Sequence, residues 1–175
     1  MTFGHKLTTV IVVALLASLA GEGTSHAQAF TPYTNPAGGF TIMYPGHWEQ
    51  RMVGTTVVAL SPQEGPADTF RENANVVFEN LNMAMAPQQY AMASLGAMQR
   101  QLTGFALMEQ GPTVVAGRPA HYLVYNHVMG QSLQVLAFFV VVGSRGYVVT
   151  CTATPAQFQR YRPLFMQIAN TLRFP

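Results

Sequence analysis

The residues with the richest chemistry lie in the segment 71–75. Arg71 offers a planar guanidinium, Glu72 a carboxylate, and Asn73 and Asn75 two amides. Such groups bind a polar ligand or the backbone of a partner, because they form charge-assisted and directional hydrogen bonds. The structural interpretation, which we favour, pairs Arg71 with Glu72 and lets the asparagines satisfy backbone groups of the loop. The segment is nevertheless the first candidate for a ligand- or partner-binding site.

A second candidate pair, His47 and Trp48, follows a predicted type II turn at Pro45-Gly46. Trp48 is the only tryptophan of the chain, and an exposed indole would offer a flat platform for a ligand. A buried tryptophan instead closes a hydrophobic core, and we favour that interpretation. If the chain were a carrier of a small ligand or metal, His47, Trp48 and Arg71 should line one cleft.

Catalytic groups are scarce. A serine hydrolase needs a nucleophile, a base and an orienting acid. The serines of residues 30–175 lie outside any G-x-S-x-G motif, the only aspartate is Asp68, and no glycine-rich loop has phosphate-binding spacing. We predict no catalytic residues, no cofactor and no enzyme activity, with a hydrolase of unfamiliar design as the weakest alternative.

Metal binding is the other chemistry to consider. A zinc site would need the histidines of residues 30–175, His47, His121 and His127, to converge without a thiolate. Thioether ligands for Cu(I) could come from methionines near the first predicted helix, although methionines there more often fill gaps in packing. These are Met83, Met85, Met92 and Met98. We predict no metal site.

Residues 1–29 have the layout of a secretory signal peptide. A basic start at His5-Lys6 precedes an apolar run over 7–20, and Ala27-Gln28-Ala29 is an A-x-A cleavage site that competes with 25–27. The apolar run is shorter than the roughly 20 residues that span a bilayer, and a lipoprotein would need a cysteine here. We expect a periplasmic or secreted protein with neither a transmembrane nor a lipid anchor.

Charge and cysteine content exclude further classes. A formal net charge of +2 is too small, and too thinly spread, to attract nucleic acid or an anionic membrane. Cys151 is the only cysteine, so no internal disulfide forms. Its strand-like surroundings indicate a small buried side chain, since nothing nearby would lower the pKa of the thiol.

Alternating apolar residues predict a sheet that positions these side chains. Residues 39–44 should form the opening strand after a surface lead-in at 30–38, and the first three strands an antiparallel meander. Residues 133–142 are apolar on nearly every position, so this strand should be central, with layers on both faces. The remaining strands are predicted at 55–60, 75–80, 105–110, 113–115, 120–126, 132–142 and 147–152.

Two amphipathic helices complete the prediction. The first begins at Ala86-Pro87 and ends near Gly104. The second begins at Thr154-Pro155, with Gln157 at the capping-box position, and contains Pro163, which predicts a kink or an initial short turn. Helices and hairpin-linked strands together predict one α+β domain over 30–175 with a mainly antiparallel sheet.

Five landmarks in sequence resemble the PsbP-like superfamily, which includes the extrinsic photosystem II protein P, DcrB-type bacterial exported proteins and a yeast import factor that binds the GTPase Ran. The resemblance covers nearly all of residues 30–175. It implies an α/β/α sandwich with helices on both faces and, for most members, no enzyme activity. The landmarks are Gly39-Phe40 to Tyr44-Pro45 with Trp48; Phe70 to Asn73 with Asn75 to Val77; Gly117 to Ala120 with Tyr122; Tyr147 to Thr150; and Tyr161, Phe165 and Ile168.

The chain departs from this pattern twice. Many bacterial relatives end the last helix in Ser-Phe, where this chain has Thr171-Leu172, and many are lipoproteins, whereas this chain lacks the cysteine. The resemblance implies no shared ligand, because function is carried by sites and not by folds. We hypothesise an exported protein that acts through contacts with an unknown protein partner, as an envelope assembly or accessory factor. The alternative is a periplasmic small-ligand or metal-binding protein.

Overall fold

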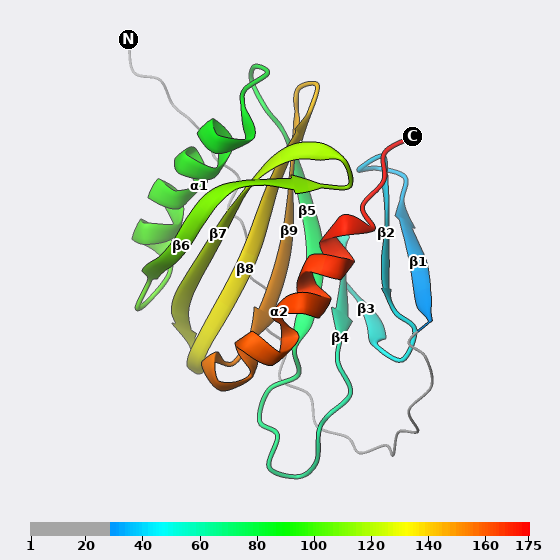
Figure 1. The fold of residues 1–175 in the computed structure, drawn as a ribbon, viewed down its shortest axis with the longest axis vertical. Helices are drawn as coiled ribbons and strands as arrows, with labels where there is room; N and C mark the ends of the chain where they lie inside the picture. The colour runs from blue at the N-terminus through cyan, green and yellow to red at the C-terminus, as the bar shows by residue number, and fades with distance from the viewer. Residues whose placement is uncertain (1–28) are drawn as a thin grey trace.

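The computed structural model describes residues 29–175 (Figure 1). The predicted signal peptide therefore lies, except for Ala29, outside the described residues. The elements follow the chain in this order: β1 (Phe30–Asn35), β2 (Phe40–Pro45), β3 (Glu49–Val53), β4 (Thr56–Leu60), β5 (Asn73–Asn80), α1 (Pro87–Gln101), β6 (Ala106–Val115), β7 (Arg118–Met129), β8 (Gln131–Val142), β9 (Arg145–Ala153) and α2 (Pro155–Asn170).

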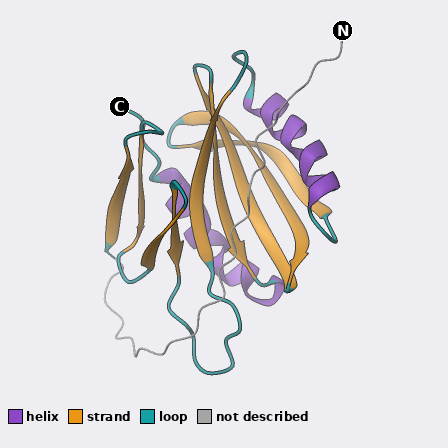
Figure 2. Cartoon of the chain, turned by 180° about the vertical axis from the view of Figure 1, so that it is seen from behind, coloured by secondary structure: helices purple, strands orange, loops and turns teal. Residues whose placement is uncertain are grey.

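Seven strands form one antiparallel sheet in the order β3-β4-β5-β9-β8-β7-β6. α2 packs on one face, and α1 packs on β7 and β8 on the other face (Figures 1 and 2). β8 confirms the prediction of a doubly covered strand, since Leu136 and Phe138 face the α2 side while Val135 and Phe139 face the α1 side. The fold is the predicted α/β/α sandwich.

α1 begins at Pro87, as predicted, and Gln89 Oε1 accepts a hydrogen bond from the Ala86 amide at 2.9 Å. Its buried face includes Tyr90, whose ring lies 5.4 Å from that of Phe139. A side chain at Gly146 would come within 2.6 Å of the Tyr90 ring. The glycine in β9 therefore allows the helix to approach the sheet closely.

α2 is one helix that continues through Pro163. The capping-box prediction at Thr154 is wrong, because the threonine side chain makes no cap hydrogen bond. The Thr154 carbonyl oxygen instead accepts from the amides of Gln157 and Phe158 at 3.0 and 2.9 Å, so those donors need no side chain. A bidentate ion pair between Arg162 and Glu109, with 2.9 and 2.7 Å bonds, ties α2 to β6.

The predicted lead-in is a strand. β1 pairs antiparallel with β2, and these two strands form a separate small sheet beside α2 (Figure 1). Residues 39–44 therefore do not open the main sheet. The prediction that they form a meander with the next two predicted strands is wrong, because β3 takes their place beside β4 and β5. β1 was missed because it contains Pro32, a residue that usually indicates a loop but is tolerated on an edge strand. β3 was missed because its residues are mostly polar. The two short strands predicted near 105–115 form one strand, β6, with an irregularity between Leu107 and Glu109.

The predicted type II turn is also wrong. Trp48 N–H donates to Pro45 O at 2.9 Å, so Pro45 is the first residue of the turn. Gly46 is absent from the glycines with positive φ. It is needed for another reason: an added Cβ would lie 2.8 Å from the carbonyl oxygen of Ala29, which accepts a hydrogen bond from the Gly46 amide at 2.6 Å.

The end of the chain closes the small sheet. Thr171 Oγ1 accepts from the Met43 amide at 2.9 Å and donates to the carbonyl oxygen of Ile168 at 2.6 Å, with the Met43 carbonyl oxygen at 3.2 Å. The backbones of Thr41 and Arg173 exchange two hydrogen bonds of 2.9 and 2.7 Å. The free edge of β2 is thus paired by residues that follow α2.

Candidate functional site

The segment 71–75 connects the loop 61–72 to β5. Successive side chains of a strand point to opposite faces, so the main sheet divides the candidate residues. Ala74 belongs to the apolar cluster on the α2 side. Asn73 and Asn75 face the α1 side, because Asn73 is in register with Thr152, whose neighbour Val135 packs under α1.

Arg71 holds the ends of the loop together. Its Nε donates to the carbonyl oxygen of Ser61, Nη2 donates to that of Leu60 at 3.3 Å, and Nη1 pairs with Glu49 Oε2 at 2.7 Å. The predicted Arg71–Glu72 pair does not form. Glu72 is 2% exposed and accepts from Ser61 Oγ at 3.1 Å, and burial raises the pKa of its carboxyl.

The opposite side of the loop is fixed to α2. Glu64 pairs with Arg160 at 2.6 Å and accepts from the Tyr161 hydroxyl at 2.8 Å, while its amide donates to Asp68 Oδ2 at 2.9 Å.

The Trp48 ring is buried 6.3 Å from the Tyr161 ring. Trp48 therefore closes the core, which agrees with the interpretation that we favoured.

His47, Trp48 and Arg71, which were expected to line one cleft in a ligand or metal carrier, differ in their surroundings. Trp48 faces α2, whereas the next residue, Glu49, binds Arg71 and is in register with Leu60 and Asn73 of the α1 side. His47 lies exposed on the turn. The buried indole of Trp48 is therefore not available as a platform in a cleft with His47 and Arg71.

The structure instead brings together four polar side chains that we name the inner polar patch: Asn73, Asn75, Thr150 and Thr152. Asn73 is in register with Thr152 and Asn75 with Thr150 on the adjacent strands β5 and β9. All four are at most 3% exposed. Asn73 Nδ2 donates to the Arg71 carbonyl at 3.3 Å. The two threonines were missed, although polar residues at alternate positions of a buried strand could have indicated them.

The histidines and methionines considered as metal ligands lie in different parts of the described fold. His121 and His127 are buried on β7, six residues apart along the strand or about 20 Å. No group of three or more histidine, cysteine, aspartate or glutamate residues with suitable geometry occurs within residues 29–175. Met98 is buried on the sheet-facing side of α1, whereas Met83 is 67% exposed. Cys151 is fully buried, which raises the pKa of its thiol.

His127 should make stability depend on pH. Burial lowers its pKa, although the nearby Val128 backbone opposes the shift and no described group meets hydrogen-bond geometry with either ring nitrogen. As the pH falls below about 6.5, the imidazole of residue 127 takes up a proton in the unfolded state before it does so in the folded state. The stabilising effect of the neutral His127 is therefore complete above that pH. It falls on acidification, by at most about 1.4 kcal/mol per pH unit. Urea unfolding of His127→Leu should show a flatter loss between pH 7 and 5.5.

Thr113→Val on β6, which removes no titratable group, is the control for this measurement and should keep the pH dependence of the unchanged protein. Burial lowers the pKa of His121 as well, so a residual slope is expected in His127→Leu. An unaltered slope in that variant would contradict the assignment.

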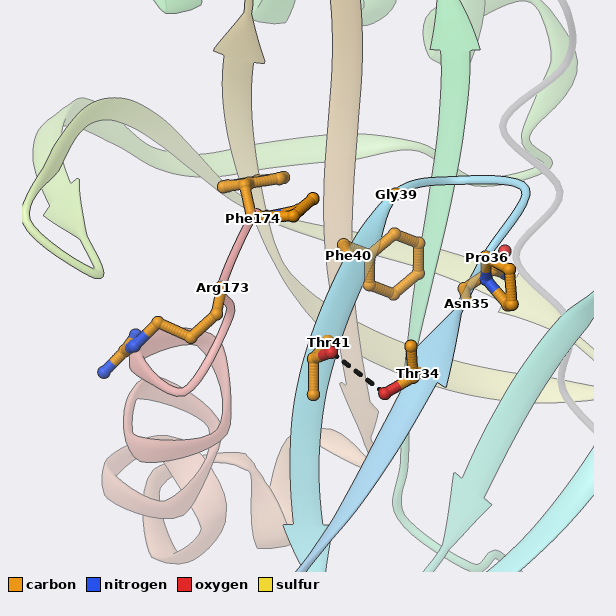
Figure 3. A pocket seen from close by; sticks show the side chains of 9 residues that line it. Thr34, Asn35, Pro36, Gly39, Phe40, Thr41, Arg173 and Phe174 are labelled. Atoms are coloured by element: carbon orange, nitrogen blue, oxygen red, sulfur yellow. Dashed lines mark hydrogen bonds between the residues drawn. The ribbon is translucent and has the colours of Figure 1, made fainter.

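A pocket of about 360 Å³ lies between the β1–β2 turn and the last residues of the chain (Figure 3). The hydroxyls of Thr34 and Thr41 bond to each other at 3.0 Å. Arg173 points away from Phe40 (Figure 3), and its Nη1 donates to the carbonyl oxygens of Asn170 and Leu172, both at 2.8 Å. The polar groups of this pocket thus largely serve the local structure, and none of the predicted site residues lines it.

Comparison with protein-family models and with curated sequences finds no match. Solved structures do match. Cyanobacterial PsbP of Synechocystis is 14% identical with a TM-score of 0.61, over 90% of this chain and 99% of that one. LpqN, involved in cell envelope biogenesis of Mycobacterium tuberculosis, is 15% identical with a TM-score of 0.63, over 86% and 93%. The Ran-binding protein Mog1p of Saccharomyces cerevisiae is 11% identical with a TM-score of 0.60, over 85% and 96%.

The fold is that of PsbP-like proteins, as the sequence landmarks predicted. Among these neighbours, Mog1p binds Ran, and LpqN is involved in cell envelope biogenesis. Within residues 29–175, neither helix has the length and apolar character needed to cross a bilayer.

Proposed function

We propose that the chain is an exported, non-catalytic protein that acts through protein contacts, as an envelope assembly or accessory factor. The observation that carries this proposal is the loop 61–72, which projects from one end of the sheet (Figure 1). Side chains from β3 and α2 hold it in place. Long loops of this kind are usually either mobile or functional, and this one is held by specific contacts.

The loop presents a preformed surface. Pro62, Pro66, Ala67 and Thr69 are exposed, while Phe70 is buried beneath them. A loop that is already ordered loses little conformational entropy on binding. Charged side chains of the loop form ion pairs that hold it in place. We therefore assign the loop to binding and not to catalysis.

Two neighbours support this proposal by analogy of fold. Mog1p binds Ran, and LpqN takes part in envelope biogenesis. Neither partner is transferred to this chain, because the site and not the fold determines the partner. The signal-like segment 1–29 supports a periplasmic or secreted location. Cleavage after Ala29 would leave Phe30 at the N-terminus, whereas cleavage after Ala27 would retain the carbonyl of Ala29 that bonds Gly46.

A photo-crosslinking amino acid at Ala67 should capture one envelope protein in near-equal amount when the chain is expressed, exported and processed in its own host. Mass spectrometry identifies the adduct and the mature N-terminus in the same sample. The matched control carries the photo-crosslinker at Ser144, which is exposed on the turn after β8, at the opposite end of the sheet (Figure 1).

Glu64→Gln provides the structural control, because it weakens the pairing with Arg160 and loosens the loop. It should reduce the yield of the Ala67 adduct severalfold without unfolding the domain. Equal capture from Ala67 and Ser144, or no discrete adduct from either position, would overturn the assignment of this loop as the contact surface.

A further inference from the structure

The loop 61–72, which connects β4 to β5 (Figure 1), has a buried carboxyl group at its base. The Ser61 amide donates to the Glu72 carbonyl oxygen at 2.7 Å, and the Ser61 hydroxyl donates to Glu72 Oε2 at 3.1 Å. Glu72 is 2% exposed and Ser61 is fully buried. Within the described residues 29–175, Glu72 forms no ion pair. The carboxyl that closes the loop is therefore held by a neutral donor and has little contact with solvent.

The groups around this carboxyl would not compensate a negative charge on it. They come from the loop and from α2, and they are Glu64, Asp68, Arg160 and Tyr161. The two acidic residues carry a like charge. Arg160 and Tyr161 both bond to Glu64, at 2.6 and 2.8 Å. Arg71, the preceding residue in the chain, is paired with a carboxylate of β3. An ionised Glu72 would thus be buried beside two other carboxylates, with the nearby arginines engaged elsewhere.

Closure of the loop is favoured while Glu72 is protonated. Burial raises the pKa of its carboxyl above the ordinary value of 4.5, and the nearby carboxylates act in the same direction, although hydrogen bonds to the carboxyl oppose the shift. In an open loop the carboxyl reaches water, and its pKa returns toward 4.5. The stabilisation of the closed loop is therefore complete below that pH and is lost as the pH rises through the raised pKa.

We propose that Glu72 regulates the loop 61–72 by pH: the loop is closed while the carboxyl of Glu72 is neutral, and it opens when that carboxyl ionises. In the open loop the carboxylate is hydrated and is separated from Glu64 and Asp68. Opening disrupts the ordered surface around Ala67, so contact with a partner is weaker at higher pH. This last consequence rests on the proposed function of the loop, whereas the opening itself does not.

Hydrogen exchange of the processed protein, measured by mass spectrometry from about pH 4 to about pH 8, tests the proposal. The protection of the loop amides, corrected for the intrinsic pH dependence of exchange, reports how often the loop opens. It should fall as the pH rises above 4.5, by up to about tenfold per pH unit, and level off once the closed state ionises as well. Constant protection of the loop over this range overturns the proposal.

Amides of β8 serve as the reference for opening of the whole domain. Titration of His127 acts in the opposite direction, because it destabilises the fold on acidification. Protection that falls with rising pH in the loop but not in β8 therefore reports the loop alone. A parallel fall in both would overturn the assignment to a local opening.

Glu72→Gln keeps the size of the side chain but cannot ionise, so the protection of its loop should no longer change with pH. Glu109→Gln is the matched control, because it removes a carboxylate of β6 that pairs with Arg162 outside the loop. It should keep the pH dependence of the unchanged protein. A dependence that persists in Glu72→Gln would overturn the proposal.

Carbon-13 NMR of the unchanged protein gives a second test that needs no variant. The titration midpoint of the Glu72 carboxyl should lie above 4.5 and coincide with the pH at which the loss of loop protection levels off. A midpoint at or below 4.5 would overturn the proposal even if Glu72→Gln failed to fold.

The Ala67 crosslink, repeated over the same pH range, separates this proposal from the proposed function of the loop. Its yield should fall with rising pH together with the protection of the loop. Protection that depends on pH, without a discrete adduct at any pH, would overturn the contact surface and uphold the regulation. An adduct formed equally at every pH, with constant protection, would overturn the regulation alone.

Discussion

Arg71→Ala should lower the free energy of unfolding by about 3 kcal/mol, because several charge-assisted hydrogen bonds, each worth about 1.5–3 kcal/mol, act together and are not additive. The side chain is only 13% exposed, so solvent screens it little, and the carbonyl oxygens of Ser61 and Leu60 lose their donor. Urea unfolding at neutral pH measures the change. The Ala67 crosslink should weaken in the same variant, since the loop is released.

Arg51 provides a matched control, because it pairs with the same carboxylate, Glu49, from a side chain that is 35% exposed. Hydrogen bonds from Arg51 and then Arg71 hold the pKa of Glu49 below its usual range. Arg51→Ala should nevertheless destabilise the protein far less than Arg71→Ala, because solvent screens an exposed ion pair and such pairs contribute little to stability. Similar losses in the two variants would mean that Arg71 does not hold the loop.

Thr171→Val should destabilise the domain by about 2 kcal/mol, because it leaves the Met43 amide and the Ile168 carbonyl without the threonine hydroxyl. Amide hydrogen exchange should show faster exchange at Met43, and thermal unfolding should give the loss in stability.

Thr171→Ser separates the hydroxyl from the methyl group. Serine keeps the hydrogen bonds, so its loss should stay within about 0.5 kcal/mol, the usual range for a substitution that removes no such feature. If serine destabilised as much as valine, packing of the methyl group and not pairing of β2 would explain the effect.

The sequence predicted those parts of the fold in which one residue pattern determines the structure. The period of α1 and the doubly apolar run of β8 each need only local periodicity together with burial. β1 and β3 escaped prediction because each is stabilised by a neighbour, and their own residues are polar or include proline. Whether such a segment pairs is decided by the strand beside it.

In the candidate site too, features that depend on a local pattern were predicted, whereas features that depend on distant residues were not. Trp48 was placed correctly from its position after a turn. The Arg71–Glu72 pair was predicted from adjacency, but adjacent residues of an extended chain point to opposite sides, and Glu49 and Ser61 proved to be the partners. The threonines of the inner polar patch acquire meaning only from the register of β5 with β9, which no local pattern specifies.

Thr171 and Met43 are 128 residues apart in the chain, and this separation bears on when the protein can fold. As a ribosome releases the chain from its N-terminus, β2 emerges early but its free edge stays unpaired until the residues after α2 arrive. β5 likewise waits for β9. Such distant pairings form slowly. Neither pairing of this topology can therefore be completed until the later of its two segments has been synthesised.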